Sequence, residues 1–161
     1  MTEKTDLTLN VENYVLNVRA TAVIVHDGKI LIHHNKIDKH NVLIGGRVKI
    51  GEDSATTIKR EVEEELGKAI EVKDYIATIE NFFEENGKKF HEYMFVHKCE
   101  FADDKDKDIN YTLKNIEGED EIEYIWINLK DLSKYNILPK ALNKILKEEK
   151  FPVHAINIDW N

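Results

Sequence analysis

Hydrophobic and polar residues alternate along two long stretches of the chain. Residues 13–34, NYVLNVRATAVIVHDGKILIHH, predict two strands joined at Asp27-Gly28, a dipeptide typical of tight hairpin turns. Residues 75–101, YIATIENFFEENGKKFHEYMFVHKCEF, predict a second hairpin that turns at Asn86-Gly87.

Between these hairpins, apolar residues recur three or four positions apart, which predicts a helix over residues 55–66 with one apolar stripe. The stripe consists of Ala55, Ile58, Val62 and Leu66. Asp53 or Ser54 can cap the start of this helix, and Gly67 can end it.

Three further elements are expected after the second hairpin. Residues 122–129 (IEYIWINL) predict a strand, residues 138–150 a helix with Pro139 near its first turn, and residues 153–160 a closing strand. Residues 102–121 predict a charged, solvated loop. Strands in pairs around one or two helices indicate an α/β sandwich with a mixed sheet.

Composition and charge narrow the function classes. With 161 residues and no repeat or linker, we expect a single domain over 1–161 with a polar N-terminal tail at 1–10. The formal charge of −8 argues against a surface that coats nucleic acid, because phosphate backbones attract Lys and Arg, and no DNA partner is expected. It does not argue against an anionic small molecule, since a bound divalent cation can invert the local polarity.

Cysteine content and hydropathy bear on location. Cys99 is the single cysteine, so an intramolecular disulfide is ruled out and a cytoplasmic location is expected. The first ten residues do not resemble a signal peptide, and no apolar run approaches the roughly 20 residues that span a bilayer. We therefore expect no membrane association.

The predicted helix crowds four carboxylates between Glu61 and Glu65. At about 100° per residue, Glu61, Glu64 and Glu65 fall on one flank, whereas Glu63 points elsewhere. Like charges at these spacings cost roughly 0.2–0.5 kcal/mol per pair. A divalent cation with oxygen ligands would remove this repulsion. The helical spacing alone leaves a metal site and a merely solvated acidic face as equal alternatives.

The sequence around the helix carries a more specific pattern, GRVKIGEDSATTIKREVEEELG. Gly46, Glu52 and the run from Arg60 to Gly67 stand at the spacing of the Nudix box, so the chain resembles the Nudix hydrolases. The final aliphatic position of that motif departs from the consensus, because Lys68 occupies it.

This resemblance implies a Nudix-type α/β/α sandwich in which the box forms a loop-helix-loop catalytic motif. It implies hydrolysis of a nucleoside diphosphate linked to another moiety, with Mg²⁺ or Mn²⁺ as cofactor. Glu61, Glu64 and Glu65 are expected to bind the metal, with Glu52 as a weaker contributor. Arg60 is expected to orient these carboxylates.

The catalytic base stays open among glutamates inside and outside the box. A box residue such as Glu64 is one candidate by the resemblance. Glu119 is another, because family members often place an acid in the loop before the tryptophan-bearing strand.

Glu92 is a third candidate, from the hairpin pattern itself. A two-residue Asn-Gly turn would pair Phe83 with Phe90 and Asn81 with Glu92. The Glu92 carboxylate would then lie on a largely apolar face, which is costly unless it is paired or metal-bound. The alternative is an exposed position at the end of the hairpin.

Four other residues are expected near the substrate. Arg19 could contact a phosphate or base, with an ordinary surface role as the alternative. His91 could touch the substrate beside Glu92. Gly45 and Gly46 are expected to serve a tight loop at the start of the box.

The substrate itself is not identified by the sequence. Residues 83–86 (FEEN) contain neither the proline that marks ADP-ribose hydrolases nor the tyrosine that marks diadenosine polyphosphate hydrolases. A nucleoside triphosphate or related nucleotide is favoured, with a nucleotide-sugar pyrophosphatase or a non-catalytic nucleotide-binding regulator on the same fold as alternatives. Family analogy leaves a homodimer open.

Overall fold

The computed structural model describes residues 4–148 and 150–160, which form eleven strands and two α-helices. The strands are β1 (Thr8–Val11), β2 (Tyr14–His26), β3 (Lys29–Asn35), β4 (Asn41–Val42), β5 (Ile44–Arg47), β6 (Ile70–Glu85), β7 (Lys88–Phe101), β8 (Leu113–Lys114), β9 (Ile122–Asn128), β10 (Ile137–Leu138) and β11 (Val153–Asp159). The helices are α1 (Ser54–Leu66) and α2 (Leu142–Ile145), with 3₁₀ turns η1 (Asp104–Lys107) and η2 (Leu129–Lys134).

The strands form one mixed sheet organised around β2. Its main path runs β10-β4-β3-β2-β7-β6-β11, and β1 and β5 also pair with β2. The β2–β7 and β6–β11 pairs are parallel, whereas β2–β3 and β6–β7 are antiparallel. The mixed-sheet prediction is therefore confirmed.

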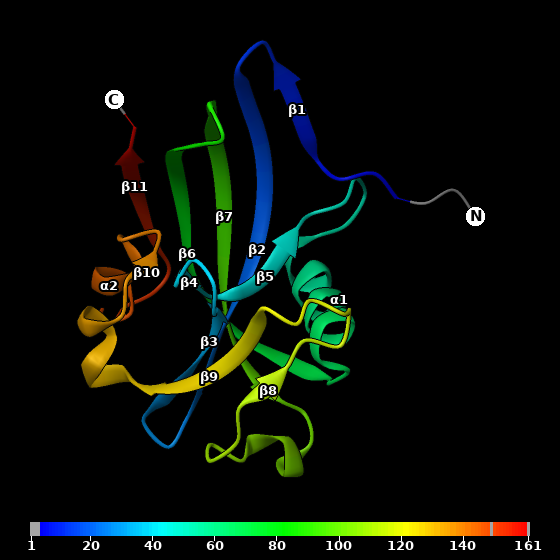
Figure 1. Cartoon of the computed structure of the whole chain (residues 1–161), viewed down its shortest axis with the longest axis vertical. Helices are drawn as coiled ribbons and strands as arrows, with labels where there is room; N and C mark the ends of the chain where they lie inside the picture. Colours follow the sequence, from blue (N-terminus) through cyan, green and yellow to red (C-terminus); the bar gives the residue numbers. More distant parts are fainter. Residues whose placement is uncertain (1–3, 149, 161) are drawn as a thin grey trace.

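Side-chain alternation along the strands supplies two cores, one on each face of the sheet. On one face, α1 contributes Ile58 and Val62 to a core that includes Ala20 and Ala22 of β2. On the other face, residues of η2 and α2 cover a core that includes Val23. Figure 1 shows α1 and α2 on opposite sides of the strands, which confirms the α/β/α layering.

Both predicted hairpins are present, and the second has the predicted register. Its turn lies at Asn86-Gly87, and Phe83 pairs with Phe90 as Asn81 pairs with Glu92. The register follows from the two-residue turn, because loop length determines which residues oppose each other.

Two expectations near the chain ends differ from the structure. Residues 8–10 lie in β1, which pairs with β2, so the expected polar tail joins the sheet from residue 8 onward. The helix expected over 138–150 is short, because only Leu142–Ile145 is α-helical and Leu138 belongs to β10. Residues 1–3 of the expected tail lie outside the described residues.

The charged loop at 102–121 is tied to the end of α1. Lys68 Nζ lies 2.5 Å from Asp106 Oδ1, so an ion pair takes the place of the aliphatic contact expected at this box position. Within this loop, Leu113–Lys114 forms β8 and pairs with β9. Across the described ranges, neither helix has the length and apolar character needed to cross a bilayer.

Candidate active site

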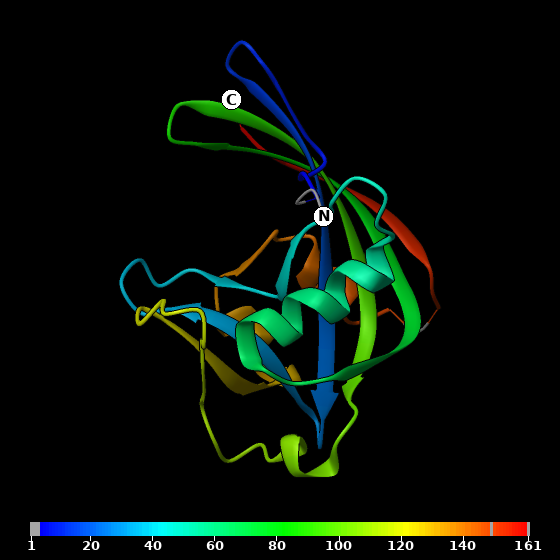
Figure 2. The ribbon, with the colours of Figure 1, turned by 90° about the vertical axis from the view of Figure 1, so that its right-hand side faces the viewer.

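The acidic helix begins and ends at the predicted residues. Asp53 Oδ1 accepts a hydrogen bond of 2.8 Å from Thr56 N at the N-terminus. Gly67 ends the helix in the left-handed region (φ 65°), and its N–H donates to Glu63 O. Such a C-terminal residue is most often glycine, because glycine lacks the Cβ that penalises positive φ. Figure 2 shows the helix that these caps delimit, lying across one face of the sheet.

Arg60 lies at the centre of the acidic flank and bonds three carboxylates. Its Nη1 donates to Glu61 Oε1 at 2.7 Å and to Glu64 Oε2 at 3.0 Å. Its Nε and Nη2 donate to the two oxygens of Glu52, both at 3.0 Å. Arg60 therefore orients these carboxylates, as the sequence predicts, and its charge offsets part of their repulsion.

Glu52 anchors this arginine rather than facing outward. Besides the bonds from Arg60, its Oε2 accepts a hydrogen bond of 2.9 Å from Thr57 Oγ1. These hydrogen bonds, led by the one from Arg60, lower the pKa of Glu52 to about 2. Both oxygens of Glu52 are thus bonded by Arg60 or Thr57, which makes Glu52 a support for Arg60. That it contributes to metal binding stays a prediction.

Glu65 is the buried member of the flank, with 7% exposure. Tyr124 donates a hydrogen bond of 2.5 Å to its Oε2, and Asn115 Nδ2 lies 3.2 Å from the same tyrosine hydroxyl. Burial, assisted by the charge of Glu61, raises the pKa of Glu65 to about 7. The charge of Glu61 is therefore near enough to disfavour the ionised form of Glu65.

The double glycine lies in strand β5 rather than in the expected tight loop. A Cβ on Gly46 would lie 2.1 Å from Glu61 Cδ, so only glycine lets this carboxylate rest against the strand. A Cβ on Gly45 would lie 2.2 Å from Ala20 O of β2. The two glycines thus permit close packing, and neither lines the cavity described below.

The loop before β9 brings a further acid to the flank. Ile116 N donates to Glu65 O at 2.9 Å, and Glu117 N donates to Asn115 Oδ1 at 2.8 Å. Burial, followed by the charges of Glu64 and Glu61, raises the pKa of Glu117. Glu119 of this loop is one of the candidate bases named from the sequence, and that role stays a prediction. Glu117 was not singled out, because five acids stand close together in this part of the sequence.

The residues present fit a hard divalent cation that keeps some of its own water. The flank offers carboxylate oxygens, the donors that Mg²⁺ and Mn²⁺ prefer. Among the described residues, no three His, Cys, Asp or Glu side chains enclose a metal position, since Arg60 and Tyr124 engage these carboxylates. That Glu61, Glu64 and Glu65 bind metal stays a prediction.

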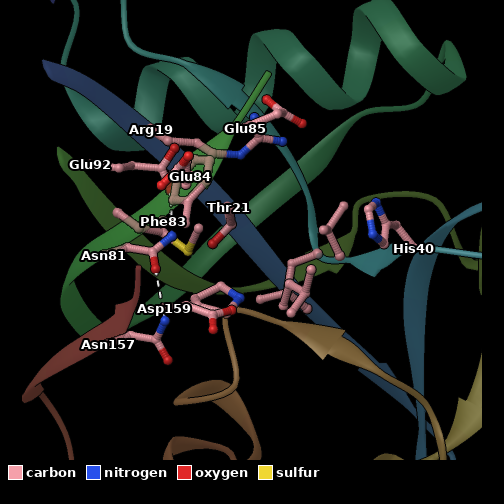
Figure 3. Close-up of a pocket in the computed structure, with 15 residues that line it drawn as sticks. Arg19, Thr21, His40, Asn81, Phe83, Glu84, Glu85, Glu92, Asn157 and Asp159 are labelled. Atoms are coloured by element: carbon pink, nitrogen blue, oxygen red, sulfur yellow. Dashed lines mark hydrogen bonds between the residues drawn. The ribbon is translucent and has the colours of Figure 1, made fainter. Parts of the chain in front are cut away.

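A cavity of about 500 Å³ opens on the face of the sheet opposite α1 (Figure 3). It is lined by polar residues and by apolar ones from β4, β7 and the segment around β10: Arg19, Thr21, His40, Val42, Leu43, Asn81, Phe83, Glu84, Glu85, Glu92, Met94, Leu138, Pro139, Asn157 and Asp159. A mostly concave site with a few convergent polar groups is typical of small-molecule binding.

Arg19 links this cavity to the acidic flank. Its side chain lines the cavity, and its Nη2 donates to Gly45 O at 3.0 Å. Its positive charge also acts on the carboxyl of Glu65, against the upward shift in the pKa of that group. The structure therefore places Arg19 between the two parts of the site.

Glu92 belongs to a hydrogen-bonded chain in the cavity wall. Asn17 Nδ2 donates to Glu92 Oε2 and Asn81 Nδ2 donates to Glu92 Oε1, both at 3.2 Å. Asn157 Nδ2 donates to Asn81 Oδ1 at 3.0 Å, the dashed line in Figure 3. Glu92 is 4% exposed, so the alternative of an exposed hairpin end is wrong.

The groups at the two ends of this hydrogen-bonded chain determine which atoms donate and which accept. Ala141 N donates to Asn157 Oδ1 at 3.3 Å, and a backbone N–H can only donate. Asn157 and Asn81 must therefore each accept on one side and donate on the other, until the chain ends on Glu92 as a pure acceptor. Asn17 only donates to Glu92, since its Oδ1 is buried without a hydrogen-bond partner among the described residues. This arrangement favours a structural and positioning role for Glu92 over that of the catalytic base.

The cavity includes Thr21, which the sequence analysis did not single out, and lacks His91, which was expected near the substrate. Thr21 lines the cavity, and its Oγ1 is buried with no hydrogen-bond partner in the described protein, so it is available to a bound ligand. His91 does not line the cavity and contacts Phe82 and Tyr93 on the other face. Neighbours on a strand point to opposite faces, so Glu92 in the cavity excludes His91 from it.

Comparisons with known proteins agree with this architecture. A family model described as the NUDIX domain matches residues 16–148. No curated protein sequence matches the chain.

Solved structures resemble the chain at low sequence identity. A NUDIX hydrolase from Nitrosomonas europaea is 13% identical over 89% of this chain and 79% of its own, with a TM-score of 0.65. A MutT protein from Methanosarcina mazei Go1 is 22% identical over 86% and 94%, with a TM-score of 0.60. An ADP-ribose pyrophosphatase from Streptococcus suis 89-1591 is 14% identical over 88% and 98%, with a TM-score of 0.59. These likenesses show a shared fold.

The Arg60–Glu52 contact predicts a pH-dependent loss of stability. The pKa of Glu52 in the folded chain is about 2, below its ordinary 4.5, so its stabilisation is complete above pH 4.5 and disappears as the pH falls towards 2. We expect Glu52→Gln to lower the free energy of unfolding by about 1–3 kcal/mol at pH 7, and by clearly less at pH 3. Urea unfolding in the presence of a chelator measures both values, with Glu63→Gln on the exposed side of α1 as the matched control. A difference that stays constant with pH would contradict the assignment.

The directed chain at Glu92 predicts a cost for an isosteric amide. In Glu92→Gln, one oxygen is replaced by a second donor that faces Asn17 or Asn81, which leaves a buried donor unpaired. We expect a loss of about 1–3 kcal/mol in unfolding free energy, measured by chemical denaturation. Glu85→Gln, on an exposed residue that lines the same cavity, should have no comparable effect. Equal stabilities for the parent and Glu92→Gln would rule out the hydrogen-bonded chain.

Proposed function

The chain belongs to the Nudix hydrolase family, and on this premise we propose that it hydrolyses a nucleoside diphosphate linked to another moiety, with Mg²⁺ or Mn²⁺ as cofactor. The observation that supports this most is the pairing of the acidic flank of α1 with a polar cavity, joined by Arg19. A nucleoside would occupy the cavity, and its diphosphate would extend past Arg19 towards Glu61, Glu64 and Glu65.

The reaction adds water across a P–O–P bridge, so the site must hold a polyanion and accept a proton from water. Glu61, Glu64 and Glu65 would hold the metal, and Arg60 would keep the first two in place. The bound metal neutralises phosphate charge and lowers the pKa of its water. Arg19 would hold a phosphate oxygen and orient the diphosphate between the cavity and α1.

Glu117 is our choice for the residue that takes the proton. The loop that carries it is fastened to α1 through the bond from Ile116 N to Glu65 O. The Glu117 carboxylate lies within electrostatic reach of Glu61 and Glu64. Its pKa is raised towards neutral pH, which favours proton transfer from water. Glu92 is held by two asparagines, so it serves the cavity wall instead.

Among substrates, we favour a nucleoside triphosphate or a related nucleotide, ahead of a nucleotide sugar. The unpartnered Thr21 hydroxyl and the two asparagine amides present hydrogen-bonding groups to the cavity, as a base or ribose would require. A non-catalytic regulator would need the cavity but not the acidic flank. The presence of this flank, with Gly46 packed closely against Glu61, therefore favours an enzyme.

A product assay tests the proposed reaction directly. The purified chain is incubated with Mg²⁺ and a panel of nucleoside triphosphates and nucleotide sugars, and pyrophosphate, phosphate and nucleoside monophosphate are measured. Release of the monophosphate supports hydrolysis of the diphosphate linkage. Tight nucleotide binding without product across the panel would favour the regulator instead.

The metal assignment predicts a sharp contrast between neighbouring glutamates on α1. We expect Glu64→Gln to lower kcat by at least about 100-fold and to weaken Mn²⁺ binding, because it removes a charge that faces the metal and phosphate. Glu63→Gln removes the same charge one residue away, on the exposed side of the helix, and should leave both nearly unchanged. Turnover assays and Mn²⁺ titration calorimetry measure the two quantities. Equal losses in both variants would mean that only the net charge of the helix matters.

The choice of base predicts a second contrast, within the loop before β9. We expect Glu117→Gln to lower kcat by at least about tenfold with a small effect on Mn²⁺ affinity. Glu119→Gln should change kcat by less than about threefold, since the charge of Glu119 acts on Glu117 and Tyr124 and is not a resolved influence on the Glu65 carboxyl. The dependence of kcat on pH should lose its acidic limb in Glu117→Gln. If Glu117→Gln turns over like the parent, a glutamate of the box is the better base.

A further inference from the structure

One face of the sheet continues past the end of α1. The β1–β2 and β6–β7 hairpins project beyond this helix in Figures 1 and 2, and no helix of the described chain covers them there. Pairing registers align one residue from each of five strands across this end: Leu9, Leu16, His91, Phe82 and Ile158. Residues paired across strands share a face, so this row runs through the middle of one surface.

We call this surface the distal face. It comprises apolar and aromatic side chains from β1, β2, β7, β6 and β11 with the residue after it: Leu9, Val11, Tyr14, Leu16, His91, Tyr93, Phe82, Ile156, Ile158 and Trp160. Leu9 is 56% exposed and Ile158 66% exposed. Such exposure of large apolar residues on one continuous surface is unusual for a monomer.

Two charged residues beside the distal face are engaged within the chain. Lys89 Nζ lies 5.7 Å from the centre of the Trp160 ring, in a cation–π contact. Glu80 Oε2 lies 2.8 Å from His154 Nε2, in a hydrogen bond beside Ile156. A partner that covers this face would therefore meet aromatic and aliphatic groups at its centre and polar groups at its edge. This anatomy is typical of protein–protein interfaces.

The size of the distal face matches what a stable dimer needs. Large apolar side chains have a surface of about 150–250 Å² each when fully exposed. At the exposed fractions seen here, the distal face has on the order of 800 Å² of accessible surface. Specific interfaces bury about 800 Å² on each partner, whereas the largest apolar patch of a typical monomer is about 300–600 Å². The face is thus large enough for one complete interface.

The shape of the face favours a second copy of the chain as its partner. A hollow of about 290 Å³ lies on the β1–β2 side, lined by Leu9, Val11, Tyr14 and Leu16 together with residues of β7. A ridge of exposed isoleucines, Ile156 and Ile158, lies on the opposite side, along β11. The hollow and the ridge thus occupy opposite margins of the same surface, which makes that surface complementary to itself.

We propose that two copies of the chain pack distal face to distal face about a twofold axis. The strand order across the face is β1-β2-β7-β6-β11, so β7 is central. An axis between the two faces and parallel to β7 lays β11 of each copy over β1 of the other. Ile158 of one copy then enters the hollow beside Leu9 of its partner, and the reverse contact forms by symmetry. This arrangement does not depend on the reaction proposed above.

Opposite charges introduced on the two sides of the predicted contact test the arrangement. Sedimentation equilibrium of the full chain at micromolar concentration should give twice the mass of one chain. Leu9→Lys and Ile158→Glu should each weaken the dimer at least about 100-fold, because each leaves an unpaired charge in an apolar contact. An equimolar mixture of the two variants should regain the dimer, since the introduced ammonium of one copy meets the introduced carboxylate of the other.

Tyr111→Glu is the matched control. Tyr111 is 67% exposed in the loop between η1 and β8, at the opposite end of the molecule in Figure 1, and its variant should stay dimeric. Circular dichroism verifies that each variant is folded. A monomeric parent, dimers that persist in both single variants, or a mixture that stays monomeric would each overturn the proposal. A monomeric parent that sediments with phosphatidylcholine vesicles would assign the face to a lipid surface instead.

Discussion

The mutual repulsion of carboxylates on α1 is the constraint around which the site is organised. Arg60 bonds Glu52, Glu61 and Glu64, and Tyr124 bonds the buried Glu65. These contacts require the Arg60 guanidinium and the Tyr124 hydroxyl to be held beside the acidic flank. The close approach of β5 at Gly46 belongs to the same solution, because a side chain there would displace Glu61. Contacts with the rest of the fold thus hold the carboxylates close together, an arrangement that would destabilise an isolated helix.

The two faces of the sheet carry different chemistry because side chains alternate along β6 and β7. Glu92 and Asn81 point into the cavity, where a directed hydrogen-bonded chain keeps them satisfied. Their strand neighbours His91 and Phe82 point the other way, into the distal face. A cavity wall and an apolar surface are therefore built from the same pair of strands. A change in register of one residue would exchange the two and destroy both.

Several parts of the fold follow from local signals. The caps at Asp53 and Gly67 set the limits of α1, and the turn at Asn86-Gly87 sets the register that places Asn81 opposite Glu92. These features depend on residues a few positions apart, so the chain alone is enough to predict them. The helix expected over residues 138–150 was too long at both ends. Leu138 pairs with Val42 of β4 as part of β10, and only Leu142–Ile145 is α-helical.

The sequence by itself determined the family of this protein, the acidic flank of α1 and the two hairpins, because each is encoded in short-range spacing. Only the tertiary structure decided that Glu117 comes within electrostatic reach of Glu61 and Glu64, and that Glu52 bonds Arg60. It also placed β1 in the sheet, on the edge of an apolar surface. These outcomes rest on contacts between distant segments, such as the parallel pairing of β2 with β7 about 75 residues further on, as between Leu16 and His91. The energy of such contacts depends on packing and burial, which no local pattern of residues records.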